Sequence, residues 1–298
     1  MGAAMPTIDP ALPTPVEQRK RFAWRETFRL LVHKPEFLIG GLVLLFWVIC
    51  AIGGETLAPH SPYIGDPFYS HTAPLTGPHI LGTDRLGRDV LSRIIVGARD
   101  VLIVAPISAV IGVALGTLLG LVMGFYRGLV DDVLGRFVEA FLSLPVTLVA
   151  LLTLVVLGSS RKTVIGVVGL LFAPIVARTV RAAVLAEREL DYVQAARLRG
   201  ERAPYVMFVE MLPNVMGPIV VEATVRLGYA IFAVAGLTFL GFGVQPPAPD
   251  WALQVAQNYQ LLAGGSYWWT VLFPGLAIAT LVVGVNLIAD GLTQVLDR

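Results

Sequence analysis

The chain has 298 residues, of which 56% are hydrophobic and only 14% are charged. Soluble domains carry about 25% charged residues, so this composition indicates an integral membrane protein with several spans. The formal net charge of +1 gives no support for a nucleic-acid partner. Cys50 is the single cysteine and lies inside an apolar run, which excludes an intramolecular disulfide and favours a small buried side chain.

The first 36 residues are expected to lie in the cytoplasm. Residues 1–18 are rich in Pro, Ala and Thr without an apolar period, which predicts a flexible tail. Basic residues with apolar neighbours follow and predict an amphipathic helix on the anionic inner leaflet. They are Arg19, Lys20, Arg21, Arg25, Arg29 and Lys34. The positive-inside rule then places the N-terminus in the cytoplasm.

Six apolar segments have about the length needed to cross a bilayer. They predict an all-α, polytopic membrane protein with six transmembrane helices and with both termini in the cytoplasm. The expected spans are residues 37–58, 101–125, 137–157, 163–185, 215–243 and 270–292. The chain divides into a cytoplasmic segment 1–36, a first span 37–58, an outer loop 59–98 and a core 99–298 that contains a cytoplasmic loop 188–213.

Two spans carry distinctive residues. Glycines recur at every fourth position of the second span, at Gly112, Gly116, Gly120 and Gly124, and small residues at this spacing let helices approach closely in lipid. The third span contains Pro145, which predicts a kink. The charged residues 126–136 between these spans predict a short cytoplasmic link.

The outer loop contains three histidines, His60, His71 and His79. Their spacing fits no metal template and no cysteine or acidic cluster joins them, so they are expected to be solvated and no metal site is predicted. The end of the loop has a helical apolar spacing from Leu86 to Ile95 and predicts an interfacial helix. Aromatic residues suit an outer membrane interface, which we expect for Trp251, Trp268 and Trp269.

Residues 191–214 form a polar, arginine-rich segment between two spans, yet they have the pattern of ordered structure. Asp191 and Gln194 have the spacing of a capping box, and Ala195 and Ala196 are good helix formers. Gly200 predicts a left-handed helix end, and Pro204 predicts the first turn of a second short helix. A loop that folds outside the bilayer in this way is expected to dock a partner.

The fifth span contains Glu222 and Arg226, one helical turn apart. Charges inside a span are costly unless they are paired or face a cavity, so they form either a self-neutralising structural pair or part of a transport path. No phosphate-binding glycine loop, no nucleophile elbow and no metalloprotease motif occurs in the sequence. We therefore expect a non-enzymatic, moving component that another protein drives.

Three motifs resemble a known family. Gln194-Ala195-Ala196 with Gly200 and Leu212-Pro213 is similar to the Glu-Ala-Ala loop of permease subunits in bacterial ATP-binding-cassette importers. Residues 81–93 with 97–99, and residues 237–247 with Trp251, resemble the dipeptide, oligopeptide and nickel class. A first span ahead of a five-span core is similar to the second, C-type permease of that class, over about residues 25–298.

The resemblance implies a pairing with a second permease, cytoplasmic ATPase subunits, an extracytoplasmic binding protein and a location in the bacterial inner membrane. This chain would bind no cofactor, since ATP and Mg²⁺ are used by the ATPase subunits. The ATPase-coupling residues would be Asp191, Tyr192, Gln194, Ala195, Ala196, Arg197, Arg199, Gly200, Leu212 and Pro213.

The sequence departs from the family pattern where Gln194 replaces a glutamate and where residues 234–243 lack an acidic residue. Small peptides are the expected cargo, and nickel chelates, other metallophores and haem-like molecules are alternatives. An ion-coupled secondary transporter and a non-transporting membrane scaffold are hypotheses of other classes; a transporter of the first kind would need no ATPase.

Overall fold

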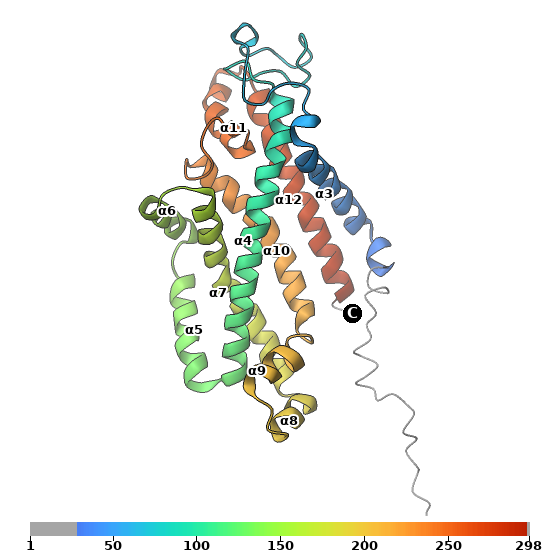
Figure 1. Ribbon diagram of the computed structural model, residues 1–298, viewed down its shortest axis with the longest axis vertical. Helices are drawn as coiled ribbons and strands as arrows, with labels where there is room; N and C mark the ends of the chain where they lie inside the picture. The colour runs from blue at the N-terminus through green and yellow to red at the C-terminus, as the bar shows by residue number, and fades with distance from the viewer. Residues whose placement is uncertain (1–28, 297–298) are drawn as a thin grey trace, which may run out of the picture.

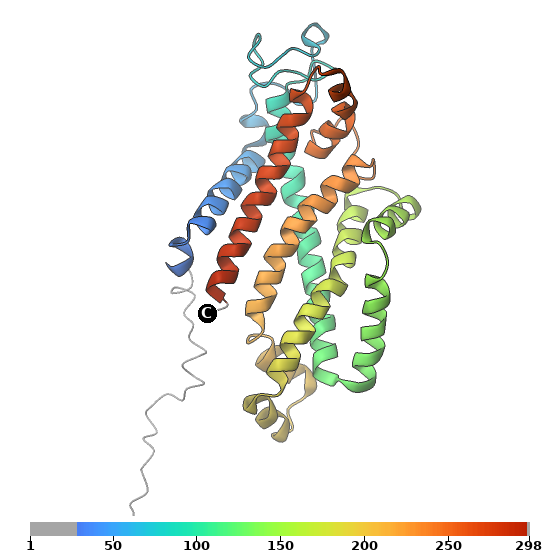
Figure 2. The same cartoon turned by 180° about the vertical axis from the view of Figure 1, so that it is seen from behind.

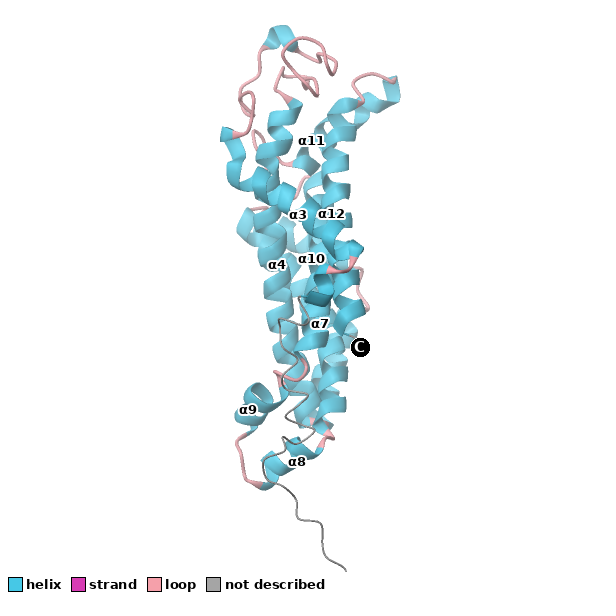
Figure 3. Ribbon diagram, turned by 90° about the vertical axis from the view of Figure 1, so that its right-hand side faces the viewer, coloured by secondary structure: helices cyan, strands magenta, loops and turns pink. Residues whose placement is uncertain are grey.

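The structure is a computed structural model that describes residues 29–296, so the predicted tail and most of the basic segment lie outside the described residues. The described chain is all-α, as predicted, and its long helices run along the long axis of the molecule (Figures 1 and 3). These helices are α3 (Pro35–Gly53), α4 (Val90–Tyr126), α5 (Gly128–Leu142), α7 (Arg161–Arg188), α10 (Met216–Phe239) and α12 (Trp269–Leu296). The helix α6 (Val146–Leu157) lies across this axis (Figure 1).

Shorter elements lie at the two ends of the bundle. They are the 3₁₀ helices η1 (Gly54–Thr56), η2 (Pro67–Tyr69) and η4 (Tyr259–Gly264), the π-helix η3 (Val206–Met211), and the α-helices α8 (Asp191–Leu198), α9 (Ala203–Tyr205) and α11 (Trp251–Asn258). Figures 1 and 2 show α11 and the loop between α3 and α4 at one end, and α8 and α9 at the opposite end. The start of α3 and the end of α12 both point toward the end that carries α8.

Five described helices are long and apolar enough to cross a membrane, and a bent pair of helices brings the total to six if it forms one span. The pair is α5 and α6, which meet at 87°. The prediction of a single kinked helix over residues 137–157 is therefore wrong. Pro145 does not lie within a helix but precedes α6 as its N-cap residue, because proline favours an extended backbone before it and ends the preceding helix.

Two predicted connections are helical instead. Residues 128–136, expected as a link, form the first part of α5, and Arg127 alone separates α5 from α4. The predicted interfacial helix is continuous with the second span, since α4 runs without interruption from Val90 to Tyr126. Asp89 caps this helix by accepting a hydrogen bond from the backbone N–H of Ser92 at 2.8 Å. The boundary expected between residues 98 and 99 thus falls inside α4.

The core of the bundle is the contact between α4 and α7. The predicted glycine repeat faces α7 along four turns, and all four glycines are buried. A Cβ atom added at Gly116 would lie 2.6 Å from the carbonyl oxygen of Ala173, and one at Gly120 would lie 2.7 Å from that of Ala177. The repeat therefore permits the close backbone approach predicted from its spacing.

Candidate functional site

The segment 191–214 is folded and packed against the bundle. Its helix α8 lies below the ends of α7 and α10 (Figure 1), and its inward side chains join a cluster that extends into the membrane-spanning helices. The cluster contains Leu121 and Phe125 of α4, Val176, Val180 and Val184 of α7, Val193 and Ala196 of α8, Val206, Met207 and Met211 of η3, and Val215 and Ile219 at the start of α10. The cluster therefore connects α8 with α4, α7 and α10.

The helix α8 ends as predicted at Gly200. This glycine has φ +73°, and its N–H donates to the carbonyl of Arg197 while the N–H of Glu201 donates to that of Ala196. These two bonds form a Schellman motif, in which a left-handed residue satisfies the last carbonyls of the helix. Pro204 then lies in the first turn of α9, also as predicted.

The predicted capping box is wrong. The N-cap residue is Leu190, which offers no side-chain cap, and Asp191 is already the first helical residue. Asp191 still places a negative charge at the positive end of the helix dipole. The side chain of Gln194 instead donates a hydrogen bond to the carbonyl of Arg188 at 3.3 Å, which links α8 to the end of α7.

The two predicted small residues have different surroundings. Ala196 is fully buried in the cluster, whereas Ala195 is exposed on the outward face. Leu198 is 89% exposed on this same loop, and Tyr205 is also exposed. The loop thus presents an outward surface of small, apolar and polar side chains outside the bundle, which is a feature of a binding surface.

Several predicted residues hold the loop together. The hydroxyl of Tyr192 donates to Glu187 at 2.6 Å and accepts from Asn214 at 3.0 Å, which joins both ends of the loop. Burial and the bond to Glu187 raise the pKa of Tyr192 above its ordinary value. Leu212 packs against the cluster, while Pro213 is exposed beside it.

The two predicted arginines of α8 also contact their own chain. The guanidinium of Arg197 lies over the ring of Phe125, 4.7 Å from its centroid. Arg199 lies 3.7 Å from both Glu201 and Glu210, and it is exposed. Ion pairs this exposed contribute little, so Arg199 remains available to an acidic partner.

Within the fifth span, Glu222 and Arg226 form an ion pair with 2.8 Å between Oε1 and Nε. Each side chain is 13% exposed, so the pair is largely desolvated. The guanidinium also lies 4.8 Å from the ring centroid of Tyr229. Tyr229 lines an apolar cavity of about 260 Å³ between α6, α7 and α10. The predicted pair exists, and it stands beside a cavity of the bundle.

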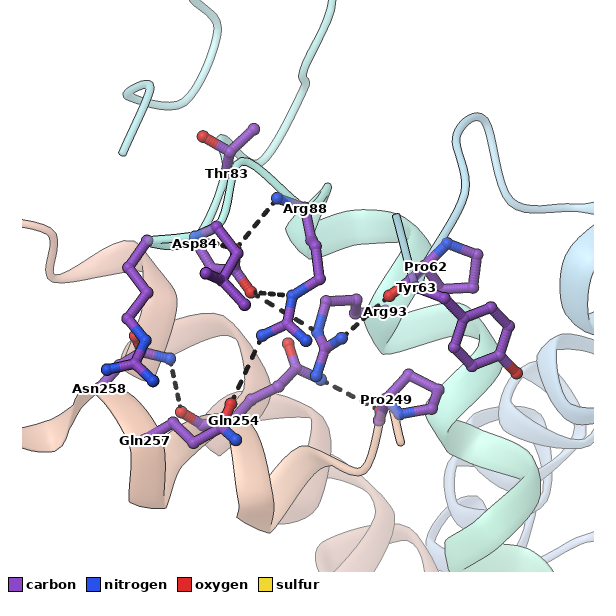
Figure 4. A network of polar contacts seen from close by, with 12 residues as sticks. Pro62, Tyr63, Thr83, Asp84, Arg88, Arg93, Pro249, Gln254, Gln257 and Asn258 are labelled. Atoms are coloured by element: carbon purple, nitrogen blue, oxygen red, sulfur yellow. Dashed lines mark hydrogen bonds and ion pairs between the residues drawn. The ribbon is translucent and has the colours of Figure 1, made fainter. Parts of the chain in front are cut away.

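A second polar site lies at the opposite end, and the sequence analysis assigned none of its residues a role. Asp84 accepts hydrogen bonds from the backbone and side chain of Arg88, and the buried Arg93 approaches the same carboxylate (Figure 4). Arg93 also donates to the carbonyls of Pro62 and Ala248. The available signal was the presence of five arginine and aspartate residues within residues 81–93, since charges of both signs at close spacing predict an internal network.

This network joins two of the motifs noted in the sequence. Gly97 packs so closely against Pro249 and Trp251 that a Cβ atom would lie 2.1 Å from the carbonyl oxygen of Pro249. The indole of Trp251 donates to the carbonyl of Ile94 at 2.8 Å and is fully buried, so the prediction that Trp251 lies at the interface is wrong. Trp269 is also buried, and of these three predicted interface residues only Trp268 is exposed.

Comparisons with known proteins agree with this arrangement. Residues 116–298 match the family model of the binding-protein-dependent transport system inner membrane component, and residues 23–78 match the N-terminal TM domain of oligopeptide transport permease C. The chain belongs to this family of inner-membrane permeases. Its architecture accordingly serves transport, and the predicted multi-pass inner-membrane location is confirmed.

Relatives cover nearly the whole permease. It is 37% identical to a di/tripeptide transport system permease protein of Pseudomonas aeruginosa over 98% of this chain and 95% of that one. It is 38% identical to a dipeptide transport system permease protein of Escherichia coli K12 over 87% and 88% of the two chains. A glutathione transport system permease protein of Pectobacterium atrosepticum is 33% identical over 96% and 94%.

A solved structure supports the fold of the permease. A chain of the MetNI methionine transporter in an inward-facing conformation superposes with a TM-score of 0.56 at 19% identity. The match covers 69% of this permease and 97% of that chain.

At the end of the bundle that carries Asp84 and Arg93, Asp250 is expected to make the stability of the permease depend on pH. Its carboxylate caps α11 by accepting from the N–H of Leu253, but burial raises its pKa to about 6. The folded-state pKa lies above the unfolded value, so the folded state binds the proton more tightly. The stability from this group is full below about pH 4 and is lost as the pH rises through about 6.

The variant Asp250→Asn keeps the capping oxygen and removes this titration. We expect it to be more stable than the wild type at pH 8, by about 2 kcal/mol, and to show a smaller change in Tm between pH 5 and pH 8. Asp250→Ala is the control that loses the cap, and it should be destabilised by about 1 kcal/mol at pH 5. Equal pH dependence of the wild type and Asp250→Asn in detergent-based thermal unfolding would contradict the assignment.

Proposed function

We propose that this permease imports small peptides as one of two paired permeases, driven by separate ATPase subunits that use ATP and Mg²⁺. The assignment of small peptides as the cargo rests on one observation. Relatives that cover nearly the whole chain are described as dipeptide and di/tripeptide permeases. A glutathione permease is also among the relatives, and glutathione is itself a small peptide. An ion-coupled transporter working alone is therefore the weaker hypothesis.

The loop 188–213 is the proposed site of ATPase coupling. Its outward surface is free of the bundle, while its inner side packs on α4, α7 and α10. By the positive-inside rule, a cytoplasmic position of the loop, where ATP is available, is favoured by Arg188, Arg197, Arg199 and Arg202. When the ATPase subunits close, they push α8, and the packed helices move with it.

The opposite end is the proposed contact with an extracytoplasmic binding protein. Three large apolar side chains of the loop between α3 and α4 project outward there, Ile64, Phe68 and Leu75, and Phe68 is 96% exposed. All three belong to the loop between α3 and α4, which extends beyond the end of α3 (Figure 1). Exposed apolar groups in this position favour a protein partner.

The decisive experiment is reconstitution of this permease with its second permease, ATPase subunits and binding protein in liposomes. ATP hydrolysis and uptake of a labelled dipeptide should both require the loaded binding protein. Labelled glutathione, a nickel chelate and haem are the comparison cargoes. Uptake driven by an ion gradient through this chain alone, or stimulation by a non-peptide cargo in place of dipeptides, would overturn the proposal.

We also propose that Glu222 and Arg226 lie along the translocation path, because charged groups in a span face a bundle interior or a cavity. Removing one charge leaves the other unpaired in a poorly solvated site, so Glu222→Gln and Arg226→Gln should each lose about 2–3 kcal/mol of stability. Dipeptide uptake should fall at least tenfold in both variants.

The double variant Glu222→Gln with Arg226→Gln distinguishes a role of the pair in the translocation path from a purely structural role. It leaves no unpaired charge, so its thermal stability should return toward that of the wild type. A role in the path predicts that uptake stays low despite this recovery. If uptake recovers together with stability, the pair is structural only.

A further inference from the structure

Three side chains that are distant in the sequence converge beneath the outer loop. His60 follows η1, His79 lies in the middle of the loop, and Asp89 caps α4. One ligand atom from each residue lies within 4.8 Å of the other two. The expectation that the loop histidines are solvated and have no acidic neighbour is therefore wrong for His60 and His79. His79 and its neighbour Asp89 are buried, and His60 is partly buried.

The two imidazoles approach the same carboxylate oxygen. The Nδ1 atom of His79 lies 2.9 Å from Oδ1 of Asp89, and Nδ1 of His60 lies 3.8 Å from it. The Nδ1 atom of His60 is buried and has no hydrogen-bond partner. A hydrogen bond to Asp89 accounts for the position of Nδ1 of His79. It leaves Nδ1 of His60 with an unsatisfied lone pair or proton.

The other oxygen of Asp89 is already engaged. Oδ2 accepts from the backbone N–H of Ser92 at 2.8 Å and from its hydroxyl at 2.6 Å. The same hydroxyl accepts from the backbone N–H of His60 at 3.0 Å. Ser92 thus fixes both the carboxylate and the backbone of His60, and it leaves Oδ1 directed at the two histidines. Support of this kind around the ligands is typical of metal sites.

The geometry points to a site for one borderline divalent cation, which we propose is Zn²⁺ or Ni²⁺ bound by His60, His79 and Asp89. Such ions take imidazole nitrogen and carboxylate oxygen at about 2.0–2.2 Å, so tetrahedral ligand atoms lie about 3.3 Å apart. The two nitrogen–oxygen separations of 2.9 and 3.8 Å bracket this value, and all three ligand atoms lie within 4.8 Å of one another. The side chain of His60 is 37% exposed, which gives the ion an entry path and leaves a further position to water.

The bound cation would join three parts of the outer end. It would connect the segment after α3, the middle of the outer loop and the first turn of α4. The loop carries Phe68 and Leu75, so the cation would hold this exposed surface in place relative to the membrane-spanning helices. The site is separate from the network of Asp84, Arg88 and Arg93, and Asp89 caps α4 through its other oxygen, Oδ2.

The test uses the full chain, purified in detergent without a histidine tag and treated with a chelator. After dialysis against Zn²⁺ or Ni²⁺ alone, metal analysis should find one ion per chain, and the Tm should rise on binding. His60→Ala removes the most exposed ligand and should weaken binding at least tenfold. Asp89→Asn retains an oxygen to cap α4 but loses the charge, and it should weaken binding similarly.

His71→Ala is the matched control, because His71 lies in the same loop but stacks on Tyr267. It should bind one ion with unchanged affinity. Substitution with Co²⁺ should give visible absorption bands that disappear in His60→Ala. The proposal is overturned if neither Zn²⁺ nor Ni²⁺ binds stoichiometrically, if His60→Ala binds as the wild type does, or if His71→Ala loses binding equally.

Discussion

Replacing Gly116 with valine is expected to destabilise the permease by about 3 kcal/mol, at the upper end of the range for overpacking. A Cβ atom at this position would lie 2.5 Å from Cβ of Val176 and 2.6 Å from the carbonyl oxygen of Ala173. The carbonyl belongs to the backbone of α7 and cannot rotate away, so α4 and α7 must separate. Close packing drives helix association in lipid, and the separation weakens the contact over its whole length.

The matched control is Gly166→Val, on the partner helix α7. A Cβ atom there meets nothing within 4 Å, and Gly166 is exposed. Both variants add the same side chain and lose the same glycine flexibility, so only Gly116→Val tests the helix contact. Thermal unfolding in detergent and the yield of monodisperse protein are the measurements. Equal losses in the two variants would show that the close approach does not matter for stability.

The close contact of α4 and α7 was predictable because its signal is local. Four glycines at one spacing define a smooth stripe on a helix, whatever its partner is. The spans α3, α7 and α12 were likewise predictable, since a bilayer imposes a minimum length on every apolar segment. Gly200 and Pro204 also act through their own backbones, and both lie where the sequence placed them.

The misplaced elements depend on partners that are distant in the sequence. Residues near Asp131 looked like a charged link, yet Asp131 lies in α5 because Arg181 of α7 donates to both of its oxygens at 2.5 and 2.7 Å. A charge that is neutralised across two helices can lie in a helix, but a single sequence does not reveal the pairing. The cluster of His60, His79 and Asp89 was missed for the same reason.

In the coupling loop, the sequence did not reveal which face of the short helix α8 packs against the bundle. The family resemblance implied that Ala195 and Ala196 both contact the ATPase. The structure divides them, because α8 turns Ala196 into the cluster with Val184 and Val206 and leaves Ala195 on the outward face. Which side of a helix faces its own protein depends on how the helix docks, and this depends on the whole cluster.

Because Ala195 and Ala196 lie on opposite faces of α8, the same substitution at the two positions is expected to have different effects. Ala195→Trp adds a large side chain to the outward face and should abolish dipeptide-stimulated ATP hydrolysis in the reconstituted complex, with a decrease of at least tenfold. Its Tm in isolation should stay within about 1 °C of the wild type, since surface substitutions are usually within 0.5 kcal/mol. Ala196→Trp overfills the cluster and should lower the Tm of the permease itself, as well as the stimulated hydrolysis.

Binding of the ATPase subunits, measured by co-purification of the complex, completes the test. Ala195→Trp should weaken or misalign this contact in a permease that is otherwise folded, and Ala195→Ser, which adds only a hydroxyl, should retain stimulated hydrolysis. Normal stimulation in Ala195→Trp would remove α8 from the proposed contact with the ATPase. A decrease in Tm equal to that of Ala196→Trp would instead place Ala195 inside the fold, because an outward residue has no packed neighbours to displace.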